Sequence, residues 1–126
     1  MSPSKRVLYV SSDSEFKALV VDLILNGKIE DALKHLAEHY TVDPPEIRVG
    51  LPKGRRRSSL GCYVTGRQTI YVLNSDSLKD PFLVLHEFYH HLRTSASTKH
   101  RGTEGNANRF AKEFIAAYGY DYSMHV

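Results

Sequence analysis

The sequence that decides the fold of this chain is Leu85-His86-Glu87-Phe88-Tyr89-His90-His91. It carries the spacing H-E-x-x-H within an apolar stretch, and Pro81 suits the first turn of a helix over residues 79–93. Residues four apart lie one turn apart on the same helix face. His86 and His90 can therefore direct two imidazole nitrogens to one point, about 2.0–2.1 Å from a shared zinc ion. The alternative is a buried helix with incidental histidines.

Glu87 lies about 100° around such a helix from His86, so it is not in line with the two histidines. Its carboxylate can still reach a water on the metal. Zinc lowers the pKa of a bound water to about 7, so the carboxylate can take its proton and later pass it to the amine that leaves a cleaved peptide bond. This pattern predicts Glu87 as the general base of a zinc peptidase.

A catalytic zinc site usually has three protein ligands and one open position. One zinc-peptidase pattern supplies the third ligand as a histidine six residues after the second motif histidine, but that position is Ala96. The remaining candidates are His91, His100, Glu104 and Glu113.

Helical geometry separates these four candidates. His91 points about 100° away from His90, whereas His100 stands in a polar loop, could swing in, and remains an alternative. Glu104 and Glu113 belong to a predicted helix over residues 103–117. Glu104 lies about 50° from the centre of its apolar stripe and Glu113 about 130° from it. Glu104 is therefore the favoured third ligand, although it could instead serve only to stabilise the helix dipole.

The N-terminal half of the chain has mainly helical periodicity. Residues 6–10 are apolar and β-branched, which favours a short strand or an ordered arm. Apolar residues recur at helical spacing over residues 15–40, and Asn26-Gly27 predicts a break between two helices. Asp43-Pro44-Pro45 ends this pattern, and residues 46–49 follow as a strand candidate.

The C-terminal half begins with two β-prone segments, residues 60–65 and 69–73, and Gly66-Arg67-Gln68 predicts a hairpin turn between them. After the two helices described above, Gly119 is a candidate C-cap, and residues 120–126 are expected to form a loosely held tail. The blocks of helices, strands and helices predict one α+β domain over residues 1–126. It would contain N-terminal helices, a small antiparallel sheet of about three strands, the active-site helix and a C-terminal ligand-bearing helix.

Composition limits the class of protein. Hydrophobic residues make up 41% and charged residues 25%, as in ordinary globular domains. No apolar run approaches the roughly 20 residues of a membrane span, and the N-terminus has no signal-peptide pattern. The single cysteine, Cys62, forms no intrachain disulfide and is expected to be a small buried residue. These features predict a cytoplasmic protein without a membrane partner.

The net charge of +3 comes with one basic stretch, whose charged residues are Lys53, Arg55, Arg56 and Arg57. A solvated loop is the expected interpretation. Binding of nucleic acid through residues 53–57 is the alternative, although no helix-turn-helix or RNA-binding signature accompanies them.

The segment after the motif carries a resemblance to a known family. Its sequence is Glu104-Gly105-Asn106-Ala107-Asn108-Arg109-Phe110-Ala111. Together with the histidine motif it resembles the ImmA/IrrE-type metallopeptidases, whose pattern is H-E-x-x-H, a loop, then E-x-x-A-x-x-F-A. The likeness spans about residues 32–117 and includes the hairpin before the motif. Tyr89 departs from it, because the family usually has a small residue there.

The resemblance implies a gluzincin, in which two histidines and a glutamate hold Zn²⁺. It implies a protein or peptide substrate that adds as a strand to a sheet edge, with limited cleavage of regulatory proteins as the known role. A non-catalytic protein-interaction module on the same scaffold is the alternative, and the sequence leaves the oligomeric state open.

Outer contacts of the metal site are also expected. Asn108 lies one turn after Glu104 and could orient it. The candidates for oxyanion donors or outer contacts are Tyr63, Tyr89, His91 and His100.

Overall fold

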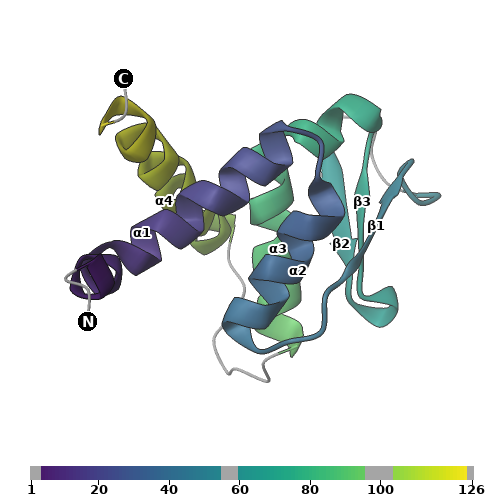
Figure 1. The fold of residues 1–126 in the computed structure, drawn as a ribbon. Coiled ribbons are helices and arrows are strands. Elements are labelled where there is room, and N and C mark those ends of the chain that lie inside the picture. The colour runs from purple at the N-terminus through teal and green to yellow at the C-terminus, as the bar shows by residue number, and fades with distance from the viewer. Residues whose placement is uncertain (1–3, 55–59, 96–103, 125–126) are drawn as a thin grey trace.

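The computed structural model describes the backbone of residues 4–54, 60–95 and 104–124, and the side chains of residues 13–54, 60–95 and 104–119. The elements are α1 (Ser4–Leu25), α2 (Ile29–Tyr40), β1 (Glu46–Val49), β2 (Gly61–Val64), β3 (Thr69–Val72), α3 (Pro81–Ser95) and α4 (Glu104–Met124). Short 3-10 helices cover Thr65–Arg67 and Ser75–Lys79. Figure 1 shows helices and a small sheet in separate blocks, so the predicted α+β class is confirmed.

The sheet is mixed rather than antiparallel. Its order is β1-β3-β2: β2 pairs antiparallel with β3, as the predicted hairpin requires, but β1 pairs parallel with β3, with Glu46 opposite Thr69. The prediction of an antiparallel sheet was wrong for β1. After β1 the chain crosses to β2, at the opposite edge of the sheet, and then turns back into β3 in the middle. Because of this route, β3 runs in the same direction as β1.

The N-terminal strand prediction was also wrong, because residues 6–10 belong to α1. Their β-branched side chains gave a strand preference, but such a preference depends on a sheet partner, and the described sheet has none for them. The predicted break after α1 is confirmed. Gly27 has φ 78°, and the Lys28 N–H donates to the Leu23 carbonyl at 2.8 Å, as in a Schellman helix end.

Helix α3 begins where the sequence suggested. Pro81 is its first residue, and the Leu83 N–H donates to Asp80 Oδ1 at 3.2 Å, which caps the helix. Helix α4 is longer than predicted, because it continues through Gly119 to Met124. The predicted C-cap at Gly119 was therefore wrong, and the tail predicted over residues 120–126 is helical as far as Met124. Helices α1 and α4 pack against each other, and this tertiary support overrides the low helix propensity of glycine.

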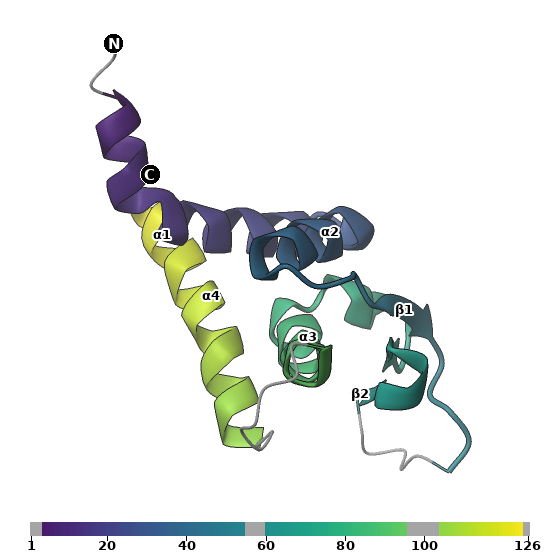
Figure 2. The same ribbon diagram turned by 90° about the horizontal axis from the view of Figure 1, so that it is seen from below.

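Helix α3 lies at the centre of the molecule. Figure 2 shows α4 on one side of it, the sheet on the opposite side, and α1 and α2 across a third side. The largest fully buried side chains come from all of these layers and include Ile24, Leu36, Ile70, Phe88 and Phe114. Within the described residues, no helix combines the length and apolar character needed to cross a membrane.

Candidate metal centre

Helix α3 carries both motif histidines on one face. The ring centroids of His86 and His90 lie 5.1 Å apart, as expected for residues one turn apart. Both side chains are partly exposed. The helix therefore presents two imidazoles to the same region of space, as the sequence predicted.

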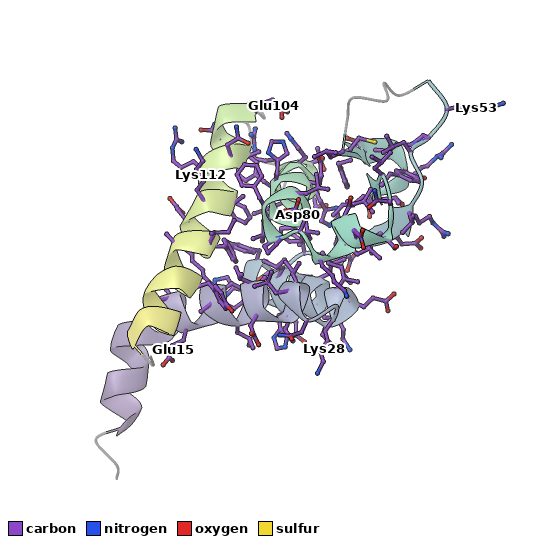
Figure 3. All side chains as sticks on the ribbon, turned by 90° about the horizontal axis from the view of Figure 1, so that it is seen from above. Glu15, Lys28, Lys53, Asp80, Glu104 and Lys112 are labelled. Atoms are coloured by element: carbon purple, nitrogen blue, oxygen red, sulfur yellow. The ribbon has the colours of Figure 1, made fainter. Side chains whose placement is uncertain are left out.

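Glu104, the first residue of α4, completes this arrangement. Its Oε1 lies 2.7 Å from His86 Nε2 and its Oε2 lies 3.2 Å from His90 Nε2. One ligand atom from each of these three residues lies within 4.8 Å of the others. The Glu104 side chain is 75% exposed, so the cluster is open to solvent. Figure 3 shows Glu104 at the N-terminal end of α4, beside α3.

Asn108 fixes the orientation of His86. Its Oδ1 lies 2.9 Å from His86 Nδ1. Because this oxygen only accepts, Nδ1 must donate, and in the neutral imidazole the lone pair is then on Nε2, which faces Glu104. Asn108 was predicted to contact Glu104, but its partner is His86. A hydrogen bond of this kind to the second ring nitrogen is usual for histidines that bind a metal.

The donor set of the cluster suits a cation. Burial lowers the pKa of His90, although the Glu104 carboxylate opposes the shift, so this imidazole keeps its lone pair at neutral pH. At 2.7 Å, His86 Nε2 and Glu104 Oε1 share a positive charge between them, either a proton, which makes the contact a hydrogen bond, or a metal cation that replaces the proton. Two nitrogens and one oxygen, open to solvent, match the ligands of a catalytic zinc site.

Glu87 follows His86 and is buried, with 6% of its surface exposed. Leu83 and His91, one turn before and after it, both contact β2, at Gly61 and Tyr63 respectively. Glu87 therefore lies on the side of α3 that faces β2, while the two motif histidines face α4. This separation places the predicted base beside the predicted ligands without making it one of them.

Tyr63 and His91, two candidates for outer contacts of the metal, instead contact each other. Tyr63 Oη lies 2.8 Å from His91 Nδ1, and His91 Nε2 lies 2.7 Å from the Asp43 carbonyl oxygen. Both nitrogens of His91 therefore have protein partners, and His91 is neither a ligand nor an oxyanion donor here. The part played by Asp43 had no signal in the sequence, because it depends on how the loop after α2 crosses α3.

Tyr89 lies on a different side of α3. Its ring centroid lies 5.3 Å from that of Phe110 on α4, and the Arg93 guanidinium lies 5.6 Å from the Tyr89 ring. Tyr89 thus packs between the helices, in the space that a small residue would leave empty. Arg93 is buried and close enough to His90 for its charge to act on that imidazole, and no sequence pattern singled it out.

The remaining candidates lie away from the cluster or outside the described residues. Glu113 is exposed, as its position on the predicted helix indicated, and its carboxylate lies 3.7 Å from Lys17 Nζ, away from the cluster. Cys62 is half-buried in β2. Lys53 is exposed beyond the sheet (Figure 3), whereas Arg55, Arg56, Arg57 and His100 fall outside the described residues.

Two hollows lined by described residues lie elsewhere. One of about 790 Å³ runs between the end of α2 and the end of α3, and one of about 470 Å³ lies between α2 and β1. Neither includes a residue of the metal cluster. The strongest chemical feature of the described surface is therefore the cluster itself.

No family model, curated protein or solved structure matches this chain.

Proposed function

We propose that this chain is a zinc-dependent endopeptidase. The observation that carries the proposal is the convergence of His86 Nε2, His90 Nε2 and the Glu104 carboxylate, drawn from two helices, within 4.8 Å. A third ligand that arrives from a separate element is what distinguishes a built site from a chance pair of histidines on one helix. Solvent exposure of Glu104 leaves room for a substrate group.

A bound zinc ion would supply Lewis acidity and bring the pKa of water close to neutral. The residues of the chain would do the rest. Asn108 holds His86 in the tautomer that presents Nε2. Glu87, next to this ligand in sequence, accepts a proton from the attacking water and returns it to the leaving amine. The chemistry is hydrolysis of a peptide bond.

The proposed substrate is an extended segment of a protein. Strand β2 is an edge of the described sheet, since it pairs only with β3 there. An exposed edge accepts an extended peptide through main-chain hydrogen bonds. The family resemblance favours limited cleavage of a regulatory protein, and the single cysteine fits the reducing conditions of the cytoplasm.

The test is to measure zinc by atomic absorption and proteolysis with fluorescently labelled casein, in wild type and in Glu87→Gln. We expect about one zinc per chain in both proteins and a fall in cleavage of about 10²–10⁴-fold in the variant, the range typical of a general base. Protein that binds no zinc, or a fully active Glu87→Gln, would contradict the proposal. Zinc binding without cleavage of any protein would favour the non-catalytic interaction module.

A further inference from the structure

His91 is a fully buried histidine that the proposed chemistry does not use. It lies on α3, and its two ring nitrogens contact groups from two other elements: the Tyr63 hydroxyl of β2 at 2.8 Å and the Asp43 carbonyl, after α2, at 2.7 Å. Because a buried ring nitrogen without a partner is costly, both contacts help to hold the ring in place, whereas an apolar ring of similar size would need neither.

The direction of both hydrogen bonds follows from the partners. The Asp43 carbonyl only accepts, so His91 Nε2 donates to it. The other nitrogen of a neutral imidazole then accepts, so the Tyr63 hydroxyl donates to Nδ1. Ser95 Oγ, one turn further along α3, lies at a longer 3.4 Å from each ring nitrogen. The two shorter bonds, to Tyr63 and Asp43, persist only if β2, α3 and the loop after α2 keep their relative positions.

Strand β2 meets α3 at a second point as well. A Cβ atom on Gly61 would lie 2.9 Å from the Tyr71 carbonyl oxygen and 3.0 Å from Leu83 Cδ1, so only glycine fits there. Gly61 and Tyr63 are two residues apart and thus point to the same face of the strand. Their contacts on α3, Leu83 and His91, lie one turn before and one turn after Glu87. The general base is therefore between the two contacts that hold β2 on the helix.

The free edge of β2 is formed by the same two residues. Leu73 N–H donates to the Leu60 carbonyl at 2.9 Å, and bonded pairs alternate along an antiparallel ladder. Cys62 and Val64 consequently direct their peptide groups to β3, whereas Gly61 and Tyr63 direct theirs outward. The peptide groups available to an added strand thus belong to the residues that contact α3.

We infer that His91 is a positioning residue that holds the outward edge of β2 in register with Glu87. The Tyr63 hydroxyl and the Asp43 carbonyl are the groups through which it acts. This inference rests on the proposed function in taking that edge as the binding site for an extended peptide. It assigns the two adjacent histidines different tasks, His90 on the metal and His91 on the substrate edge.

The test compares wild type with His91→Phe, His91→Gln and Tyr63→Phe. Phenylalanine keeps the bulk and loses both hydrogen bonds, whereas glutamine can still donate to Asp43 and accept from Tyr63. Tyr63→Phe removes one hydroxyl and is the milder change should His91→Phe fail to fold. Tyr40→Phe is the matched control, since it removes a hydroxyl from a ring that packs on Phe88, on another side of α3.

Three quantities are measured in each protein: hydrogen exchange of the Cys62 and Val64 amides by NMR, zinc affinity, and the KM and kcat for labelled casein. Loss of hydrogen bonds to His91 should speed exchange of these two amides about tenfold relative to β3. We expect KM to rise several-fold while kcat and zinc affinity stay within about twofold. In His91→Gln, the exchange rates of the two amides and the KM should lie close to the wild-type values.

The inference would be overturned by unchanged exchange in both His91→Phe and Tyr63→Phe, or by equal acceleration in the Tyr40→Phe control. A fall in zinc affinity or kcat with KM unchanged would place the role of His91 at the metal instead and would also overturn it. Wild type that binds zinc but cleaves neither casein nor any host protein would remove the proposed function alone. The exchange of Cys62 and Val64 would then decide whether His91 positions β2.

Discussion

The two sides of α3 use histidine in opposite ways. On the side that faces α4, His86 and His90 direct their Nε2 atoms to an exposed carboxylate, at 2.7 Å and 3.2 Å from its oxygens. On the side that faces β2, His91 is fully buried and both of its nitrogens have protein partners. Residue type and position in a motif therefore do not assign a role to a histidine. Its role depends on whether groups of the protein already form hydrogen bonds with both ring nitrogens.

The largest expected effect is on the α4 side. Glu104→Ala removes the only ligand of the cluster that comes from outside α3, and we expect zinc affinity to fall by more than about 100-fold, beyond the loss typical of an outer contact. The measurement is a competition titration with a chelator of known affinity. Glu113→Ala is the matched control, because it removes an exposed glutamate from the same helix. Equal losses in the two variants would show that the metal is held elsewhere.

A smaller effect is expected one step outward from the metal. Asn108→Ala removes the acceptor for His86 Nδ1, and the loss of such an outer contact typically weakens metal binding about 10–100-fold. The same titration measures it. Asn108→Asp should retain binding, because a carboxylate accepts the same hydrogen bond. Full affinity in Asn108→Ala would show that the tautomer of His86 is fixed in another way.

On the β2 side the expected effect is on stability rather than on metal binding. A double-mutant cycle of Tyr63→Phe and His91→Phe should give a coupling energy of about 1 kcal/mol, the net value of one hydrogen bond. The measurement is urea unfolding of the four proteins with excess chelator present. Additive losses would indicate that the two side chains contribute independently, and the contrast between the two sides of α3 would weaken.

A pH-dependent effect on stability is expected in alkaline solution, on the side of α3 where Tyr40 packs against Phe88. Burial, and then the charges of Asp13 and Glu113, raise the pKa of Tyr40 to about 12. An unfolded tyrosine ionises near pH 10, so the stability that Tyr40 contributes is complete below about pH 10 and is lost as the pH rises toward 12. The difference in unfolding free energy between wild type and Tyr40→Phe should therefore shrink across this range. A constant difference would contradict the raised pKa and with it the packing on this side of α3.

Local sequence patterns predicted that His86, His90 and Glu104 would come together. His86 and His90 meet because four residues make about one helical turn, and Glu104 was separated from Glu113 by its angle to the apolar stripe of α4. The break at Asn26-Gly27 was equally local, since Gly27 supplies the positive φ that ends α1. Each of these features depends on residues close together in the chain.

Features that depend on distant parts of the chain were missed. His91 contacts Tyr63 across 28 residues and Asp43 across 48, so only the assembled topology brings them together. The parallel pairing of β1 depends on which edge the chain crosses to, and the persistence of α4 through Gly119 depends on α1. Residues 6–10 have the composition of a strand and nevertheless form a helix, because no described strand lies beside them.

The most direct test of the account is X-ray absorption spectroscopy of the zinc-loaded protein. We predict two imidazole nitrogens at about 2.0–2.1 Å, with oxygen from Glu104 and solvent in the remaining positions and no sulfur. In Glu104→Ala the oxygen shell should change while both imidazoles remain. A sulfur ligand from Cys62, or a spectrum with fewer than two imidazoles, would contradict the centre formed by His86, His90 and Glu104.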